Sequence, residues 1–351
     1  MNQITTEIAK TPTEKALLDI WRQALEWDEI SVDDDYFELG GNSVTAVVIF
    51  DAIAAEFDKR LPLSTLYEYS SIATLSQAVD DFDPEAAFAP LVTITTGGSG
   101  HRPLFCVHAL NGQITCYHDL IIGLPADQPV FGLQYPDQHK DPRPALSVED
   151  MAVLYADIIE QTQPSGAVAV AGYSFGCLPA FETARQLRRR GREIDRLILF
   201  DGHAPGTAPS VLRRAFLHDL TELRDLPWYA RLQAVAKAAP NGMRRLTRRA
   251  VASFKLRMRL ALPDPSVIEQ IEAILGQASK TYRPALFDGD VILFAAAQSD
   301  RYWQDDRYRG WQPFVTGTIT VEPVPGDHLS CFEKPHVDEI SKRLRPYLDG
   351  R

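Results

Sequence analysis

The chain has 351 residues with 36 basic and 47 acidic side chains, so its formal net charge at pH 7 is −11. Its 45% apolar and 24% charged residues are ordinary for globular domains and exclude a disordered or fibrous chain. The acidity argues against a nucleic-acid-binding protein. Since no uncharged apolar run approaches the roughly 18 residues of a membrane helix, we expect neither nucleic acid nor a membrane as a partner.

The cysteines and the N-terminus indicate the cellular compartment. Four cysteines occur, and none forms a C-x-x-C pair, so nothing points to a metal site or a redox motif. The first residues, MNQITTEIAK, lack the apolar core of a secretory signal. We therefore predict reduced thiols, no bound metal and a cytoplasmic location.

The charge is unevenly distributed along the chain. Residues 1–85 hold 18 of the 47 acids but only 5 of the 36 bases, a net charge of −13, whereas the rest of the chain carries +2. Such asymmetry marks a domain boundary. We predict a small acidic domain at residues 1–82, a linker rich in Ala and Pro at 83–90, and a large domain at 91–351.

The small domain shows only helical patterns. Apolar residues at helical spacing follow Pro12 and Thr13 in the run ALLDIWRQAL, and the pattern returns from Ser43 to about Phe57. A short helix is predicted near residues 63–67 and a last one near 72–79. We therefore expect a small all-α bundle of four helices.

The stretch before the second predicted helix is D-Y-F-E-L-G-G-N-S, residues 35–43. Its two glycines free the backbone and leave the Ser43 hydroxyl exposed at the helix start. Such a serine is commonly an N-cap, and the alternative is a modification site. The stretch resembles the attachment motif of acyl and peptidyl carrier proteins. This resemblance implies 4′-phosphopantetheine bound covalently to Ser43 and a phosphopantetheinyl transferase as a partner.

The cargo of such a carrier stays open. Asn42 stands where peptidyl carriers more often have His or Asp, so the chain carried is peptidyl, aryl or polyketide. Surface acids near Asp33 are either plain solvated residues or a surface that steers a basic partner.

The large domain alternates apolar runs typical of strands with helical patterns. Strands are predicted at residues 91–98, 103–110, 129–135, 167–173, 196–201, 290–297 and 318–324. Helices are predicted in the runs LSVEDMAVLYADIIEQT, CLPAFETARQLRRRG and PHVDEISKRLRPYL. This alternation predicts an α/β fold with a mostly parallel sheet.

One segment interrupts the alternation. Residues from about 205 to 283 are rich in Leu, Arg and Ala at helical spacing and contain no convincing strand, so we predict a helical lid. Seven basic side chains lie between Arg244 and Arg259. They form either a solvated helix face or a docking patch for the acidic domain.

A nucleophilic serine is indicated at the end of the fourth predicted strand. Gly172-Tyr173-Ser174-Phe175-Gly176 matches G-x-S-x-G, which is a weak pattern alone but is supported here by its strand–turn–helix setting. The glycines allow a sharp turn that exposes the Ser174 hydroxyl at a helix N-terminus. The alternative is an ordinary turn serine. We interpret Ser174 as the nucleophile.

A serine nucleophile needs a histidine base, and hydrolases of this type follow the chain order Ser, acid, His. Among the eight histidines, His328 follows the last predicted strand in the loop P-G-D-H and is our candidate. His336 begins the final helix, where we expect it to cap or pack. His108 precedes the nucleophile and is better placed to shape a loop than to act as the base.

The residues alone leave two candidates for the acid that orients His328. Asp201 ends the predicted strand RLILFD, and Asp300 follows the predicted strand DVILFAAAQS. Asp201 ends the next strand after that of the nucleophile, and consecutive parallel strands are commonly neighbours, which favours Asp201.

An oxyanion hole needs two N–H donors, and one of them belongs to the residue after the nucleophile, here Phe175. The second is expected in the loop H-A-L-N-G that follows an early strand. We predict the N–H of Leu110, with Ala109 as the alternative.

The motifs FCVHALNG, FGLQYP, GYSFG, LILFDG and VPGDH make residues 90–351 resemble the type I thioesterase domains that terminate nonribosomal peptide and polyketide assembly lines. The resemblance implies an α/β hydrolase fold with a helical lid and favours Asp201 as the acid. This chain has His-Ala-Leu-Asn-Gly where that family often has His-Pro-Ala-Gly-Gly, a departure that bears on the geometry of the oxyanion donors.

Together the two resemblances imply release of an acyl or peptidyl chain through an acyl-enzyme on Ser174, by hydrolysis, cyclisation or condensation. The expected partners are upstream synthetase domains, which load the carrier, and a small-molecule acyl or peptidyl cargo. No adenylation or condensation domain fits in 351 residues, so the chain is either a fragment or a small stand-alone protein. The alternatives are a general serine esterase and an inactive module that only presents the carrier.

Overall fold

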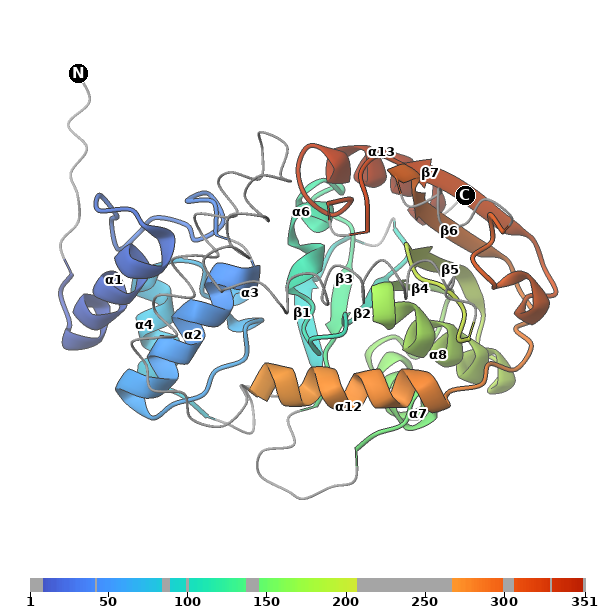
Figure 1. The fold of residues 1–351 in the computed structure, drawn as a ribbon, viewed down its shortest axis with the longest axis horizontal. Helices are drawn as coiled ribbons and strands as arrows, with labels where there is room; N and C mark the ends of the chain where they lie inside the picture. The colour runs from blue at the N-terminus through green and yellow to red at the C-terminus, as the bar shows by residue number, and fades with distance from the viewer. Residues whose placement is uncertain are drawn as a thin grey trace, which may run out of the picture. The chain divides into compact units, whose positions relative to one another are not determined.

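The computed structural model describes residues 9–41, 43–83, 89–98, 101–136, 145–206, 267–298, 306–328 and 330–349. Two compact units divide the chain (Figure 1). One contains the described residues up to 83, and the other contains those from 89 onward. Most of the predicted linker and lid, the seven basic side chains of that lid, and Asp300 lie outside the described residues.

The first unit is helical, as predicted. Its helices are α1 (Pro12–Leu25), α2 (Ser43–Phe57), α3 (Thr65–Glu68) and α4 (Ile72–Asp80). Thr11 and Glu14 form a capping box that starts α1, and Ser71 with Thr74 does the same for α4. The helices close around a core that includes Leu17, Trp21, Tyr36, Ile49, Ile53, Leu66, Leu75 and Val79.

The second unit is built on a seven-stranded sheet with the order β1-β3-β2-β4-β5-β6-β7. The strands are β1 (Leu91–Thr95), β2 (Leu104–Val107), β3 (Val130–Leu133), β4 (Val168–Tyr173), β5 (Ile194–Phe200), β6 (Val291–Ala296) and β7 (Ile319–Val324). Only β1 pairs antiparallel, so the prediction of a mostly parallel sheet is confirmed.

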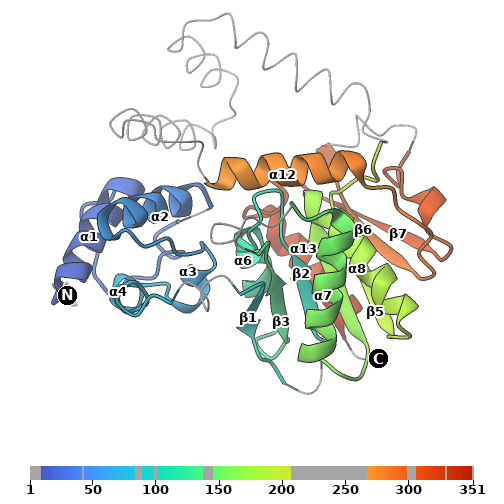
Figure 2. The same cartoon turned by 90° about the horizontal axis from the view of Figure 1, so that it is seen from below.

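Helices cover the sheet in layers (Figures 1 and 2). On one face lie α7 (Val148–Thr162) and α8 (Cys177–Arg189), and α12 (Val267–Thr281) crosses the ends of the strands; all three share the main apolar core with the sheet. On the other face α6 (His118–Ile122) packs against α13 (His336–Leu348). Because both faces are covered, β4 and β6 are buried along their whole length, which explains their unbroken apolar sequences.

Several helix ends follow the sequence signals. Ser147 and Asp150 form a capping box that starts α7, and Gly191 ends the α8 region with a positive φ of 82°. The short α6, which lies between β2 and β3, has no counterpart among the predicted elements. No helix within the described ranges is both long enough and apolar enough to cross a membrane.

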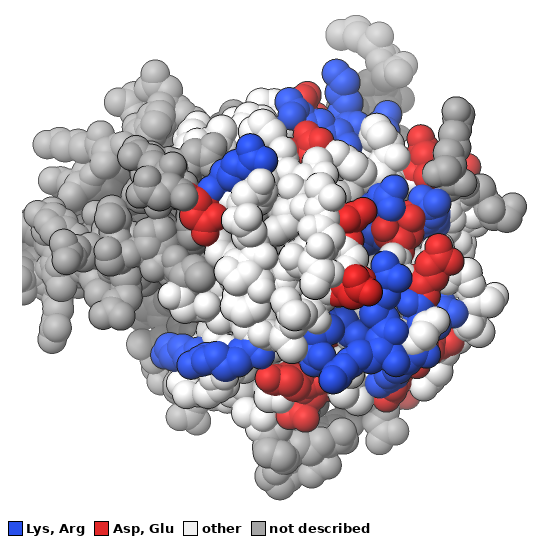
Figure 3. Space-filling view, turned by 90° about the vertical axis from the view of Figure 1, so that its right-hand side faces the viewer, with Lys and Arg blue, Asp and Glu red and all other residues white. Residues whose placement is uncertain are grey.

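The surface of the second unit mixes charges of both signs, in keeping with its small net charge. Figure 3 shows Lys and Arg gathered on one face with Asp and Glu between them. Arg190 at the end of α8 pairs with Asp157 and Glu160 of α7 at 2.6 and 2.8 Å. Such half-exposed pairs contribute about 0–1 kcal/mol each to stability.

Candidate active site

Ser174 stands on a sharp turn between the end of β4 and the start of α8. Its φ of 56° lies in the left-handed region, and the glycines on either side allow the turn. A Cβ on Gly172 would lie 2.2 Å from the Gly176 carbonyl oxygen, and one on Gly176 would lie 2.5 Å from that of His108. The backbone is therefore so closely packed that only glycine fits at both positions.

His328 lies in the loop after β7 and reaches the serine. Its Nε2 is 2.9 Å from the Ser174 Oγ. The hydroxyl of Tyr173 donates to the backbone carbonyl of His328, and the two rings stack with centroids 5.5 Å apart. Tyr173, the residue before Ser174, thus fixes the loop that carries His328. His336 starts α13, as expected, and its Nδ1 lies 3.1 Å from the Ser330 carbonyl oxygen.

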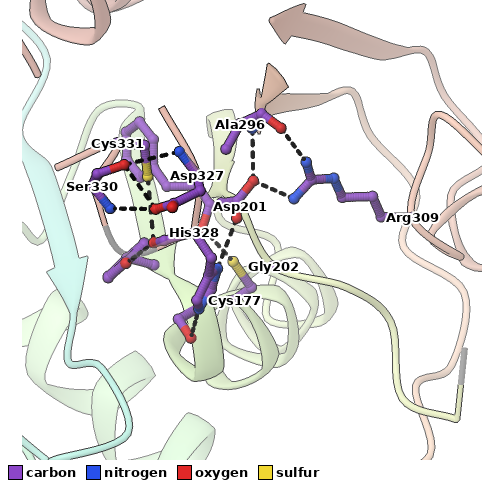
Figure 4. Close-up of polar contacts among 12 residues, drawn as sticks. Cys177, Asp201, Gly202, Ala296, Arg309, Asp327, His328, Ser330 and Cys331 are labelled. Carbon is purple, nitrogen blue, oxygen red and sulfur yellow. Dashed lines mark hydrogen bonds and ion pairs between the residues drawn. The ribbon is translucent and has the colours of Figure 1, made fainter. Parts of the chain in front are cut away.

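Asp201 follows β5, which is the direct neighbour of β4 in the sheet, as the strand order predicted. Its Oδ2 is 2.7 Å from the Nδ1 of His328 (Figure 4). The structure therefore joins Ser174, His328 and Asp201 in one hydrogen-bonded chain. Its members come from the ends of three different strands.

The loop after β2 packs against the turn that carries Ser174, since the His108 carbonyl oxygen would lie 2.5 Å from a Cβ on Gly176. The N–H of Ala109 donates to the Gln113 carbonyl at 3.2 Å, and the Ala109 carbonyl accepts from the Gly112 N–H at 3.0 Å. The Leu110 N–H has no acceptor among the described residues, and Leu110 is 38% exposed. Of the two amides considered, Leu110 thus offers a free donor and Ala109 does not.

The turn before α2 is packed against the helix. A Cβ on Gly41 would lie 2.3 Å from the Cζ of Tyr36, which is fully buried, and the Tyr36 hydroxyl is 2.6 Å from the Thr45 Oγ1. Ser43 is the first residue of α2. A helix N-terminus favours an anionic group, so this packed turn fits a phosphate ester at that position.

Comparison with known proteins identifies both units. Residues 102–348 match the family model of the thioesterase domain. The chain belongs to the thioesterase domain family. Residues 15–79 match the phosphopantetheine attachment site family, so a carrier domain precedes the thioesterase domain. The prediction of a carrier–thioesterase pair typical of nonribosomal peptide synthetase termination is thereby confirmed.

Curated relatives of this thioesterase chain are large synthases. It is 27% identical over 363 residues to chondramide synthase cmdD of Chondromyces crocatus, covering 97% of the chain and 9% of that protein. It is 33% identical over 349 residues to indigoidine synthase of Dickeya dadantii, covering 96% of the chain and 23% of that protein.

A solved structure supports the α/β hydrolase fold of the thioesterase. The NocB thioesterase domain, in covalent complex with a fluorophosphonate nocardicin G analog, is 26% identical, with a TM-score of 0.51. The match covers 74% of this chain and 100% of that one.

Asp201 has two further hydrogen-bond partners that the sequence did not predict. Its Oδ1 accepts from the Ala296 N–H at 2.7 Å and from the guanidinium of Arg309. Burial alone would raise the pKa of Asp201, but the His328 hydrogen bond, the charges of Arg309 and His328 and the Ala296 bond together hold that pKa below its usual value. Arg309 is 108 positions away in the chain, and no local motif marks it.

His108 takes part in the loop rather than in proton transfer. It is fully buried, and its Nδ1 lies 2.7 Å from the Ala109 carbonyl oxygen. Burial, opposed in part by that hydrogen bond, lowers the pKa of His108 to about 4. The imidazole is therefore neutral at pH 7, and its Nδ1–H donates to the carbonyl of the peptide unit whose N–H belongs to Leu110.

The described residues hold no cluster of three or more His, Cys, Asp or Glu side chains suited to a metal ion. All four cysteines are free thiols. Burial raises the pKa values of Cys106 and Cys177, and that of Cys116 to about 12, so these thiols are poor nucleophiles at neutral pH.

Proposed function

We propose that Ser174, His328 and Asp201 are the catalytic triad of a thioesterase that releases an acyl or peptidyl chain from the carrier domain. The observation that carries this proposal is the hydrogen-bonded chain of 2.9 Å from Ser174 to His328 and 2.7 Å from His328 to Asp201. These distances suit proton transfer from the serine and orientation of the imidazole.

The first step is acylation of the serine. His328 Nε2 accepts the Ser174 proton while the Oγ attacks the carbonyl carbon of the thioester substrate. Asp201 holds the Nδ1–H tautomer and stabilises the imidazolium. The C–S bond then breaks, the proton passes from Nε2 to the departing thiolate, and an ester on Ser174 remains.

The negative charge that develops on the carbonyl oxygen needs donors. We assign the N–H groups of Phe175 and Leu110 to this oxyanion hole, because Phe175 follows the nucleophile and the Leu110 N–H is free within the described structure. Through its bond to the Ala109 carbonyl, His108 fixes the plane of the Ala109–Leu110 peptide.

Release is the second half of the reaction. His328 deprotonates water, an internal nucleophile of the chain or a second acyl unit, which then attacks the Ser174 ester. The proton returns to the Ser174 oxygen as the product leaves. The outcome is hydrolysis, cyclisation or condensation, according to which nucleophile the cargo offers.

We assign Ser43 as the attachment residue of the carrier domain. The 4′-phosphopantetheine group, when bound, presents the cargo as a reactive thioester. The packed Tyr36–Gly41 turn supports this, because it fixes the start of α2, where Ser43 stands. The partners proposed with it are a phosphopantetheinyl transferase and upstream synthetase domains that load the cargo.

An active-site label tests the proposal without knowledge of the cargo. A small alkyl fluorophosphonate should add one phosphonyl group to the protein, and peptide mapping should place it on Ser174. The variant S174A should take up none, while Ser330, a serine beside the histidine loop, should stay unlabelled. A label on another residue, or equal labelling of S174A, would rule out Ser174 as the nucleophile.

A substrate comparison separates the rival functions. A general esterase would cleave free esters as fast as carrier-bound thioesters, and an inactive module would cleave neither. We expect turnover of a carrier-bound acyl thioester that exceeds turnover of the matching free ester.

A further inference from the structure

A buried ion pair adjoins the triad on the side away from His328. The side chains of Arg309 and Asp201 are each only 2% exposed, and the guanidinium donates to the Oδ1 of Asp201 and, at 3.3 Å, to the Ala296 carbonyl. The Ala296 N–H already bonds the same Oδ1 at 2.7 Å. Burial of a cation is costly. We therefore expect Arg309 to contribute its positive charge in addition to a hydrogen bond that a neutral donor could also give.

The two oxygens of the Asp201 carboxylate have different hydrogen-bond partners. Oδ1 accepts from Arg309 and Ala296, whereas Oδ2 is left to His328 at 2.7 Å (Figure 4). Rotation of the carboxylate group would break both contacts at Oδ1. The arrangement therefore presents Oδ2 to the imidazole in one fixed direction.

The backbone around Arg309 is fixed to the same loop. Arg309 has a φ of 52°, and its carbonyl accepts from the Ala204 N–H at 3.0 Å. The Trp311 Nε1–H donates to the Gly202 carbonyl at 3.1 Å. The turn that carries Arg309 thus holds Gly202 and Ala204, which follow Asp201 closely in the chain, and it brings the guanidinium to the carboxylate.

Most other titratable groups around the pair are uncharged at neutral pH. Burial raises the pKa values of Tyr173, Cys177 and Cys331. Burial also lowers the pKa of His203. Two carboxylates on neighbouring turns are also described. Asp327 accepts from the N–H and the hydroxyl of Ser330 at 2.9 and 2.7 Å, and Asp306 accepts from the N–H groups of Tyr308 and Gly310 at 3.0 and 2.6 Å. Within the described residues, Arg309 is the arginine that pairs with the Asp201 carboxylate.

Resting on the proposed function, we propose that Arg309 is a positioning residue of the triad. Its guanidinium keeps Asp201 ionised and aimed at His328. Its positive charge is also one of the interactions that hold the pKa of Asp201 below its usual value, so the carboxylate stays ionised, and His328 oriented, to lower pH. Arg309 does not touch the substrate in this account and acts only through Asp201.

The rate of phosphonylation tests this without a known cargo. In that reaction the Ser174 oxygen replaces fluoride at phosphorus, and His328 takes the serine proton. We expect R309Q, which keeps hydrogen-bond donors but loses the charge, to react about 10²-fold more slowly, the size of effect that a misplaced catalytic group produces. The acidic limb of its pH–rate profile should move to higher pH. R309K should be slower than wild type but keep the wild-type limb.

A double variant separates positioning from a general structural role. Since Arg309 acts through Asp201, adding R309Q to D201N should cause no further loss of rate. An equal loss in both backgrounds, or wild-type rate and pH profile in R309Q, would overturn the proposal. If circular dichroism shows that R309Q is unfolded, R309K provides the test instead. A shift of the acidic limb of the R309K pH–rate profile would contradict the proposal. Failure of the wild type to react at Ser174 would instead refute the proposed function.

Discussion

Three residues of the site other than glycine adopt left-handed backbone conformations. The φ angles of Ser174, Asp201 and Arg309 are 56°, 50° and 52°. Such conformations cost on the order of 1 kcal/mol each and persist only where surrounding contacts impose them. In this site the proposed nucleophile, the proposed acid and the arginine that contacts the acid all share this feature, so backbone strain is concentrated around His328.

The choice between the two candidate acids gives the first prediction. Replacing Asp201 by Asn removes the acceptor that fixes the His328 tautomer, and we expect turnover to fall by up to about 10⁴-fold. The matched control is D300N, for which we expect a far smaller effect. Both variants are compared by kcat on one acyl thioester. A crippled D300N beside a near-normal D201N would place the acid on the later strand.

His108 gives a prediction for stability. Its pKa falls from 6.5 to about 4 on folding, so the unfolded chain binds more protons between these values. The free energy of unfolding should therefore decrease as the pH is lowered through this window, by up to about 1.4 kcal/mol per pH unit from this residue.

Urea titrations of the wild type and H108N at several pH values measure this contribution. Asn keeps an amide donor near the place of Nδ1 but does not titrate, so its stability should depend less on pH between 6.5 and 4. His203 and Asp201 are common to both proteins and cancel in the difference. Equal slopes would contradict a buried, neutral His108.

At the residue scale, motifs and strand order in the sequence predicted the three residues that the structure joins by hydrogen bonds. G-x-S-x-G marked Ser174, the loop after the last strand marked His328, and the neighbouring strands favoured Asp201. Arg309 was missed because it lies in the charged run QDDRYRG, where nothing distinguishes a buried arginine from solvated ones. Its role depends on a contact 108 positions away, which no local pattern reports.

At the scale of elements, the close approach of the start of α8 to the sheet positions Ser174. A Cβ on Gly176 would meet the backbone oxygens of His108 and Val107 at 2.5 and 2.8 Å. These atoms belong to the end of β2 and to the loop that carries Leu110. The turn that carries Ser174 and the loop that carries Leu110 are therefore held against each other by a contact that leaves no room for a side chain.

A pair of glycine variants tests this packing. G176A should lower the free energy of unfolding by about 1–3 kcal/mol, as overpacking does, and should slow phosphonylation of Ser174. G276A is the control, because Gly276 lies within α12 and, among the described residues, no atom outside its own helix lies within 4 Å of an added Cβ. It should stabilise the protein by up to about 1 kcal/mol through helix propensity. A G176A protein as stable as wild type would contradict the packing account.

The elements themselves followed the sequence closely where periodicity was strong. All seven predicted strands occur, and α2 spans Ser43–Phe57 as expected. The short α6 was missed because five residues are too few to show a helical period. The antiparallel direction of β1 was also beyond the pattern, since direction depends on pairing with β3 and not on composition.

At the scale of the whole molecule, an acidic carrier domain and a nearly neutral thioesterase domain share one chain. Their serines have separate tasks in our account, since Ser43 receives the arm and Ser174 removes the cargo. Loss of one task should leave the other intact. A phosphopantetheinyl transferase with coenzyme A should thus add one arm to the wild type and to S174A, but none to S43A.

The most direct test of the central claim is intact-mass spectrometry after loading. Wild type and S174A are loaded with the same acyl group from an acyl-coenzyme A, and the mass of the loaded protein is followed over time. We predict that the acyl mass disappears from the wild type while S174A keeps it, apart from slow uncatalysed hydrolysis. Loss of the acyl group from S174A at the wild-type rate would contradict release through Ser174.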